Sequence, residues 1–131
     1  MKIETLRWTN SKLEMIDQRI LPASFKYLVY DSAASVAEGI RSMVVRGAPA
    51  IGVAAAYGVA LEALRLSSYS KPTPPLNSTF QVEGWGKDEF KAGMEAGFNV
   101  LAQSRPTAVN LFWALKRMRA VWESVKEKSN I

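Results

Sequence analysis

The first thirty residues alternate between apolar and polar side chains in three short runs. Residues 3–8 and 12–17 alternate well enough for two strands, and a Thr-Asn-Ser turn sequence separates them. Residues 25–30 form a third run that is rich in aromatic side chains and follows a Leu-Pro-Ala-Ser break. The pattern predicts a small three-stranded antiparallel sheet over residues 1–30, one face of which needs a helix to cover it.

From residue 31 onward the apolar side chains recur at steps of three and four, which is typical of helices. N-cap residues at positions 31–32, or a capping box that begins at Ser35, offer two possible starts for the first helix. The next helix, residues 49–66, is rich in alanine and glycine and almost free of charge, so we expect it in the core. Residues 31–66 are therefore predicted to form two helices.

A change of composition to serine and proline predicts a long loop over residues 67–87. Two further helices are expected in residues 88–131, because Pro106 interrupts an otherwise helical pattern and Thr107 can cap a new helix. The predicted fold class is α+β, with the small sheet followed by an irregular four-helix bundle. The length of 131 residues fits one domain.

The composition narrows the chemistry that this chain can perform. It has no cysteine and no histidine, which excludes disulfides, thiolate nucleophiles, histidine-based triads and imidazole-bound metals, so we expect no metal site. The formal net charge is +5, but the basic residues are scattered, which favours solvated surface and no nucleic-acid partner. The apolar helix is too short and too rich in small residues for a membrane span, and charged residues at the N-terminus argue against a signal peptide.

Residues 46–52, Arg-Gly-Ala-Pro-Ala-Ile-Gly, combine a loop with the start of the apolar helix. Pro49 suits the first helical position, and Gly47 can take a positive φ. The amides of residues 50–52 are then expected to be unpaired at the positive end of the helix dipole, next to the guanidinium of Arg46. This combination predicts an anion-binding site. The alternative is a structural junction whose arginine pairs with a carboxylate, and the chemistry alone leaves both open.

A second arginine precedes a proline and a helix start in residues 104–110, Ser-Arg-Pro-Thr-Ala-Val-Asn. If Arg46 and Arg105 meet, they would surround one doubly charged anion, and a phosphate is the natural ligand. The alternative is that Arg105 pairs with an acid such as Glu62 or Glu95.

These motifs resemble a known family. Residues 46–52 and 104–111, with Thr-Leu-Arg-Trp at residues 5–8 and Asp-Gln-Arg-Ile-Leu-Pro at residues 17–22, are similar to the methylthioribose-1-phosphate isomerases. That group also contains the regulatory subunits of translation initiation factor 2B. The resemblance covers nearly the whole chain except residues 67–87.

The resemblance implies an aldose–ketose isomerisation of methionine salvage, which converts 5-methylthioribose 1-phosphate to 5-methylthioribulose 1-phosphate without a metal or another cofactor. It implies that Arg46, Gly47 and Ala48 bind the substrate at the first helix start, and that Arg105 holds the phosphate. It also implies a cytoplasmic enzyme that is a homodimer at full length, assembled mostly through another domain.

In this family the catalytic cysteine and aspartate lie in a following, larger α/β domain. This chain ends at Ile131 and matches none of those motifs, so we expect residues 1–131 to be the N-terminal substrate-binding domain alone, with no catalytic residue and negligible turnover. A non-catalytic regulatory subunit related to initiation factor 2B is the main alternative, although two anion-binding motifs favour the enzyme. A small basic scaffold is a third possibility, supported by the charge alone.

Overall fold

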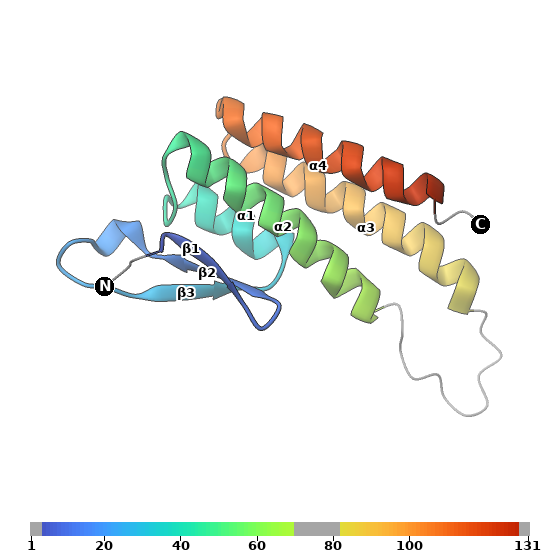
Figure 1. Cartoon of the computed structure of the whole chain (residues 1–131), viewed down its shortest axis with the longest axis horizontal. Coiled ribbons are helices and arrows are strands. Elements are labelled where there is room, and N and C mark those ends of the chain that lie inside the picture. Colours follow the sequence, from blue (N-terminus) through green and yellow to red (C-terminus); the bar gives the residue numbers. More distant parts are fainter. Residues whose placement is uncertain (1–3, 70–81, 129–131) are drawn as a thin grey trace.

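The computed structural model describes residues 4–69 and 82–128. In this part of the chain a three-stranded sheet is followed by four helices, which confirms the predicted α+β class (Figure 1). The elements in chain order are β1 (Leu6–Thr9), β2 (Lys12–Ile16), the 3-10 turn Gln18–Ile20, β3 (Tyr27–Tyr30), α1 (Ala33–Arg41), α2 (Ala48–Tyr69), α3 (Val82–Ser104) and α4 (Val109–Lys128).

The sheet is antiparallel with the order β1-β2-β3, as the alternating runs predict. Asn10 and Ser11 form the turn between β1 and β2, and both have positive φ angles of 53° and 61°. The register places Leu13 opposite both Trp8 and Tyr30, so one face of the sheet is apolar. That face packs on the helices, and the ring of Trp8 stacks on Tyr57 of α2 with the centroids 5.5 Å apart.

Helix α1 begins with a capping box at Ser32, which decides between the two predicted starts. The Ser32 side chain accepts a hydrogen bond from the Ser35 amide (3.1 Å), and the Ser35 hydroxyl accepts one from the Ser32 amide (3.2 Å). The next orphan amide, that of Ala33, donates to a carboxylate oxygen of Glu62 on α2 (3.0 Å). The start of α1 is therefore fixed by its own serines and by α2.

Replacing Ser32 with alanine is expected to lower the free energy of unfolding by about 1 kcal/mol, because the Ser35 amide loses its partner. Urea denaturation followed by circular dichroism measures this change. Ser124→Ala, at an exposed position on α4, is the control and should change the free energy by less than about 0.5 kcal/mol. Equal effects of the two substitutions would contradict the capping role.

Helix α2 is the central element, because it contacts all three other helices (Figure 1). Its inward residues Ile51, Ala55 and Leu61 are buried, as the small, uncharged composition predicts. Among the described residues, one stretch, Pro49–Ser67, is long and apolar enough to cross a membrane by length and composition alone, so the prediction that this helix is too short for a span is wrong. Core helices of soluble proteins share these properties, and α2 lies in the core.

The predicted loop over residues 67–87 is too long at both ends. Helix α2 continues to Tyr69 and α3 already begins at Val82, while residues 70–81 lie outside the described part of the chain. The glycines at positions 84 and 86 read as loop residues, but isolated glycines cost only about 1 kcal/mol each in a helix and a long helix tolerates them. Likewise, α4 begins at Val109, so Thr107 does not cap it as predicted.

Candidate anion-binding site

The loop between α1 and α2 holds the backbone of Arg46 in place. Helix α1 ends in a Schellman motif. Met43 lies in the left-handed region (φ 69°), and the amide of Val44 donates a hydrogen bond to the carbonyl of Gly39 (3.0 Å). The carbonyl of Val44 accepts a hydrogen bond from the Gln18 amide (3.0 Å), which ties the loop to the 3-10 turn after β2. Both Val44 and the following valine are buried, whereas Arg46 is exposed.

Gly47 has a φ of 98°, the positive value that the sequence predicts. No heavy atom lies within 4 Å of the position that a Cβ would occupy there, so the backbone is open to a ligand. Helix α2 begins one residue earlier than expected, at Ala48, and the Ile51 amide donates to the Gly47 carbonyl (3.0 Å). The prediction that the amides of Ile51 and Gly52 are unpaired is therefore wrong, and the orphan amides of the first turn are those of residues 47, 48 and 50.

Arg105 lies in the loop between α3 and α4, as Arg46 lies in the loop between α1 and α2. The buried hydroxyl of Ser104 donates to the Leu101 carbonyl (2.6 Å) at the end of α3. The Ala108 amide donates to the Arg105 carbonyl (3.0 Å), which closes a turn before α4 begins. Arg105 itself is partly buried at this turn.

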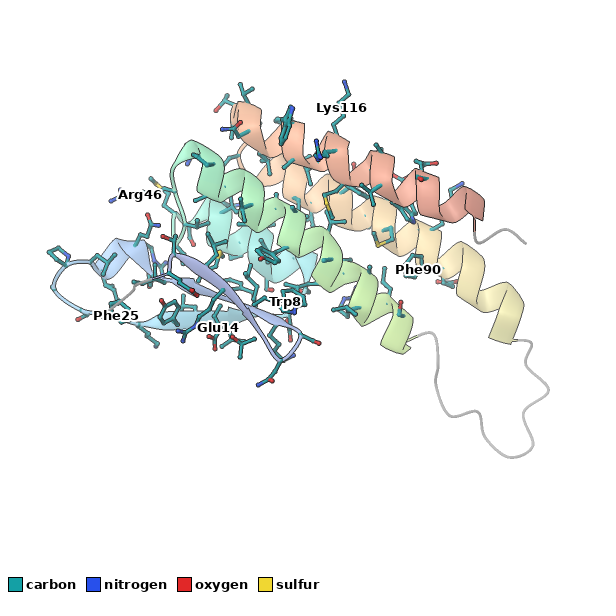
Figure 2. All side chains as sticks on the ribbon, in the orientation of Figure 1. Trp8, Glu14, Phe25, Arg46, Phe90 and Lys116 are labelled. Carbon is teal, nitrogen blue, oxygen red and sulfur yellow. The ribbon has the colours of Figure 1, made fainter. Side chains whose placement is uncertain are left out.

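The starts of α2 and α4 lie side by side at one end of the bundle (Figure 1). Their first turns approach closely, because a Cβ built on Gly52 would lie 3.0 Å from the backbone carbonyl oxygen of Asn110. Arg46 and Arg105 thus each precede one of two neighbouring helix N-termini, and Figure 2 shows Arg46 extending outward at this end. That the two guanidinium groups reach a single anion stays a prediction.

The carboxylates proposed as alternative partners are engaged by other arginines. Glu62 pairs with Arg65 (2.5 Å), and Glu95 pairs with Arg119 (2.8 Å). Within the described residues, neither Arg46 nor Arg105 forms an ion pair or a side-chain hydrogen bond. The positive charge at this end is therefore uncompensated by the described carboxylates.

The carboxylate of Asp17 is buried and pairs with a neighbouring arginine. Asp17 comes directly before the 3-10 turn, and Arg19 holds its carboxylate through both Nε (2.8 Å) and a terminal nitrogen (2.8 Å). The hydrogen bond from the Arg19 side chain lowers the pKa of Asp17 below its ordinary value. Asp17 is thus not available to neutralise Arg46 from the adjoining turn.

Among the described residues, no group of three or more His, Cys, Asp or Glu side chains is placed so that it could hold a metal ion. The arrangement offers hydrogen-bond donors and positive charge, which bind and orient an anion but supply no general base or nucleophile.

Sequence reasoning missed an apolar groove that runs from the same helix starts along α2 and α4. It has a volume of about 390 Å³ and is lined on α2 by Pro49 and Val53, and on α4 by Asn110 and Trp113. The signal in the sequence was the pair of adjacent aromatic residues at positions 112 and 113, which fall outside the buried stripe of α4.

Comparisons with known proteins agree with this architecture. The sequence model of the initiation factor 2 subunit family matches residues 44–131. The chain is 58% identical to a methylthioribose-1-phosphate isomerase of Albidiferax ferrireducens over 97% of this chain and 31% of that protein. It is 49% identical to the isomerase of the same name from Azotobacter vinelandii, over 90% of this chain and 28% of that protein.

Two solved structures have the same fold. The 5-methylthioribose 1-phosphate isomerase from Pyrococcus horikoshii is similar with a TM-score of 0.74 and 40% identity, over 94% of this chain and 30% of that one. The delta subunit of translation initiation factor eIF-2B from A. fulgidus is similar with a TM-score of 0.71 and 30% identity, over 93% of this chain and 31% of that one. The chain thus spans about 30% of the length of these relatives. Since the family match covers well over half of the 131 residues, the chain belongs to the initiation factor 2 subunit family.

Proposed function

We propose that residues 1–131 form the substrate-binding N-terminal domain of a methylthioribose-1-phosphate isomerase. In this proposal Arg105 and Arg46 hold the phosphate of 5-methylthioribose 1-phosphate, and the backbone of Gly47 and Ala48 contacts the substrate. The observation that carries it is the pair of neighbouring helix starts, each preceded by an arginine that has no partner among the described carboxylates. Identities of 58% and 49% to proteins with this name support the choice of substrate.

A phosphate held at two helix starts would orient the rest of the sugar. The free energy of phosphate binding then serves to position the reacting carbon atoms against groups that this chain does not supply. We therefore expect the 131-residue chain to bind the sugar phosphate but to turn it over negligibly. In a full-length cytoplasmic homodimer, the remaining two thirds of the polypeptide would bring the general acid and base.

A non-catalytic role in translation regulation is the second candidate. It is favoured by the structural likeness to the delta subunit of initiation factor eIF-2B, which extends over 93% of this chain. Binding specificity separates the two proposals, because a regulatory subunit has no need to prefer a sugar phosphate over inorganic phosphate.

The test is calorimetric titration of the chain with 5-methylthioribose 1-phosphate, unphosphorylated 5-methylthioribose and a short RNA. We expect salt-sensitive binding of the phosphorylated sugar only, and about tenfold weaker binding by Arg105→Ala, since one charge-assisted contact is lost.

Lys91→Ala is the matched control, because it removes the same charge from an exposed position on α3 and should leave the affinity unchanged. Binding of RNA alone, insensitive to Arg105→Ala, would contradict the proposal. Equal binding of inorganic phosphate and the sugar phosphate would favour the regulatory subunit.

A further inference from the structure

Residues 17–19, Asp-Gln-Arg, belong to one of the motifs singled out in the sequence but take no direct part in the proposed site. Asp17 is 4% exposed, and Arg19 holds both of its carboxylate oxygens. One oxygen accepts hydrogen bonds from the Arg19 amide (3.0 Å) and from Nε (2.8 Å), and the other accepts one from a terminal nitrogen (2.8 Å). This pair, the Asp17–Arg19 clamp, closes the 3-10 turn Gln18–Ile20.

The energetics of the clamp indicate a role beyond closing a turn. Burial removes the hydration of a carboxylate, and an ion pair recovers that cost only with good geometry, so apolar residues often stabilise a fold equally well. A neutral cap such as asparagine would also accept the Arg19 amide. The clamp adds a fixed orientation, because a planar guanidinium that bonds both carboxylate oxygens leaves the turn little freedom.

The clamped turn is bonded to the loop between α1 and α2, which lies next to it (Figure 1). The Gln18 amide donates to the Val44 carbonyl (3.0 Å), and the Asp17 amide donates to the carbonyl of Lys26, directly before β3 (2.8 Å). In the described part of the chain, the other backbone hydrogen bonds of residues 42–46 all return to α1. The Gln18 amide therefore provides the backbone link between this loop and the sheet.

Arg46 lies two residues beyond this link. Its side chain is exposed and forms no ion pair with a described carboxylate, so the backbone alone fixes the place from which the guanidinium extends. An anchored backbone reduces the conformational freedom that is lost when the guanidinium binds an anion, which strengthens binding. A loose loop would keep the charge but spread it over more positions.

We propose that the Asp17–Arg19 clamp is a positioning element for Arg46. The clamp orients the 3-10 turn, the Gln18 amide holds the Val44 carbonyl, and the loop thereby presents Arg46 to the anion. The inference rests on the proposed function, because it takes 5-methylthioribose 1-phosphate as the ligand.

Amide hydrogen exchange of the 131-residue chain, followed by NMR, tests the first step and needs no ligand. In Asp17→Ala the Gln18 amide is expected to exchange about tenfold faster than in the wild type, because the turn that presents it to Val44 is no longer held. The Ala108 amide, which donates to Arg105 in the loop between α3 and α4, is the internal control and should be unchanged. Unchanged exchange of the Gln18 amide would overturn the proposal.

Asp17→Asn keeps the shape of the side chain and loses its charge, so it provides the same test if the alanine variant does not fold. Its Gln18 amide should exchange about threefold faster than in the wild type, because the ion pair is lost while one acceptor remains. Exchange at the wild-type rate in this variant would show that the ion pair does not hold the loop, which also overturns the proposal.

Calorimetric titration with 5-methylthioribose 1-phosphate tests the second step. Asp17→Ala should weaken binding by about three- to tenfold, since the loss through Arg46 is bounded by the roughly tenfold loss expected from Arg46→Ala itself. In the Arg46→Ala background the same substitution should change the affinity by less than about twofold, because the residue that the clamp positions is gone. Equal weakening in both backgrounds would overturn the proposal, because it would mean that the clamp does not act through Arg46.

Glu14→Ala is the matched control. Glu14 pairs with Arg7 through the same kind of contact, from Nε to a carboxylate oxygen (2.6 Å), but within the sheet. This variant should leave both the affinity and the exchange of the Gln18 amide unchanged, and an effect equal to that of Asp17→Ala would contradict a specific role of the clamp. Absence of binding by the wild type would contradict the proposed function, whereas the exchange of the Gln18 amide still decides whether the clamp holds the loop.

Discussion

Replacing Glu62 with alanine is expected to lower the free energy of unfolding by about 2–3 kcal/mol. The Glu62 side chain is almost fully buried between α1, α2 and α3, with 6% of the residue exposed. It accepts hydrogen bonds from the Arg65 guanidinium (2.5 and 3.2 Å) and from the Ala33 amide (3.0 Å). Alanine would leave that amide without a partner, whereas the half-exposed guanidinium can return to water, which keeps the loss below the full cost of breaking a buried ion pair.

Glu38→Ala is the matched control for this prediction. Glu38 and Arg41 form an ion pair with the same spacing of three residues and a similar distance (2.6 Å), but on the exposed side of α1. Exposed pairs of this kind contribute little, so the control should change the free energy of unfolding by less than about 0.5 kcal/mol. Chemical denaturation of both variants measures the difference, and similar losses would mean that burial of Glu62 is irrelevant.

The pH dependence of stability gives an independent readout of the same group. Burial alone would raise the pKa of Glu62, but the hydrogen bonds from Arg65 and Ala33 outweigh it and hold the pKa below its ordinary value of 4.5. A carboxyl whose pKa is lower in the folded state stabilises the fold fully above its unfolded pKa, and this contribution is lost as the pH falls through the folded pKa. Glu62→Gln should therefore lose less stability than the wild type between pH 5 and pH 3, by unfolding measurements at each pH.

The local elements of this fold follow from the sequence because their causes are local. The period-two runs place all three strands within a few residues of their observed bounds, since each strand has one apolar face. The positive φ of Gly47 also follows from its position before a proline-containing helix start. By contrast, Ser35 fits a capping box in the sequence but serves as the third residue of the box that begins at Ser32.

The features that the sequence does not determine depend on long-range packing. Helix α2 begins at Ala48, with the Ile51 amide donating to the Gly47 carbonyl, so the free amides are those of residues 47, 48 and 50 and not those of residues 50–52. The adjacency of the α2 and α4 starts depends on how four helices pack, which no motif encodes. The apolar groove was missed for the same reason, since the exposure of Trp113 is decided by which neighbour covers it.

The double variant Arg46→Ala/Arg105→Ala is expected to weaken binding of 5-methylthioribose 1-phosphate by about 30-fold, the largest effect predicted for the site. Each single substitution should cost about tenfold. If both guanidinium groups contact one phosphate, removal of either lets the anion shift away from the other, so the double loss should fall short of the 100-fold product. The expected coupling is at least about 0.5 kcal/mol, which calorimetric titration of the four proteins measures as a double-mutant cycle.

Additive losses in this cycle would mean that the two helix starts bind separate anions, which would remove the geometric basis of the proposed site. Pairing Arg46→Ala with Lys91→Ala provides the additive reference, because Lys91 lies on α3 outside the site. The starts of α2 and α4 are neighbours, but neighbouring helix starts need not bind the same anion. The cycle therefore tests whether the two starts act as one phosphate-binding site. Each start alone offers orphan amides and one guanidinium, a combination strong enough to attract an anion but too open to fix the orientation of a sugar. Two starts that act on one phosphate would fix it from both sides, so coupling between Arg46 and Arg105 is the property that separates a substrate site from two solvated helix ends.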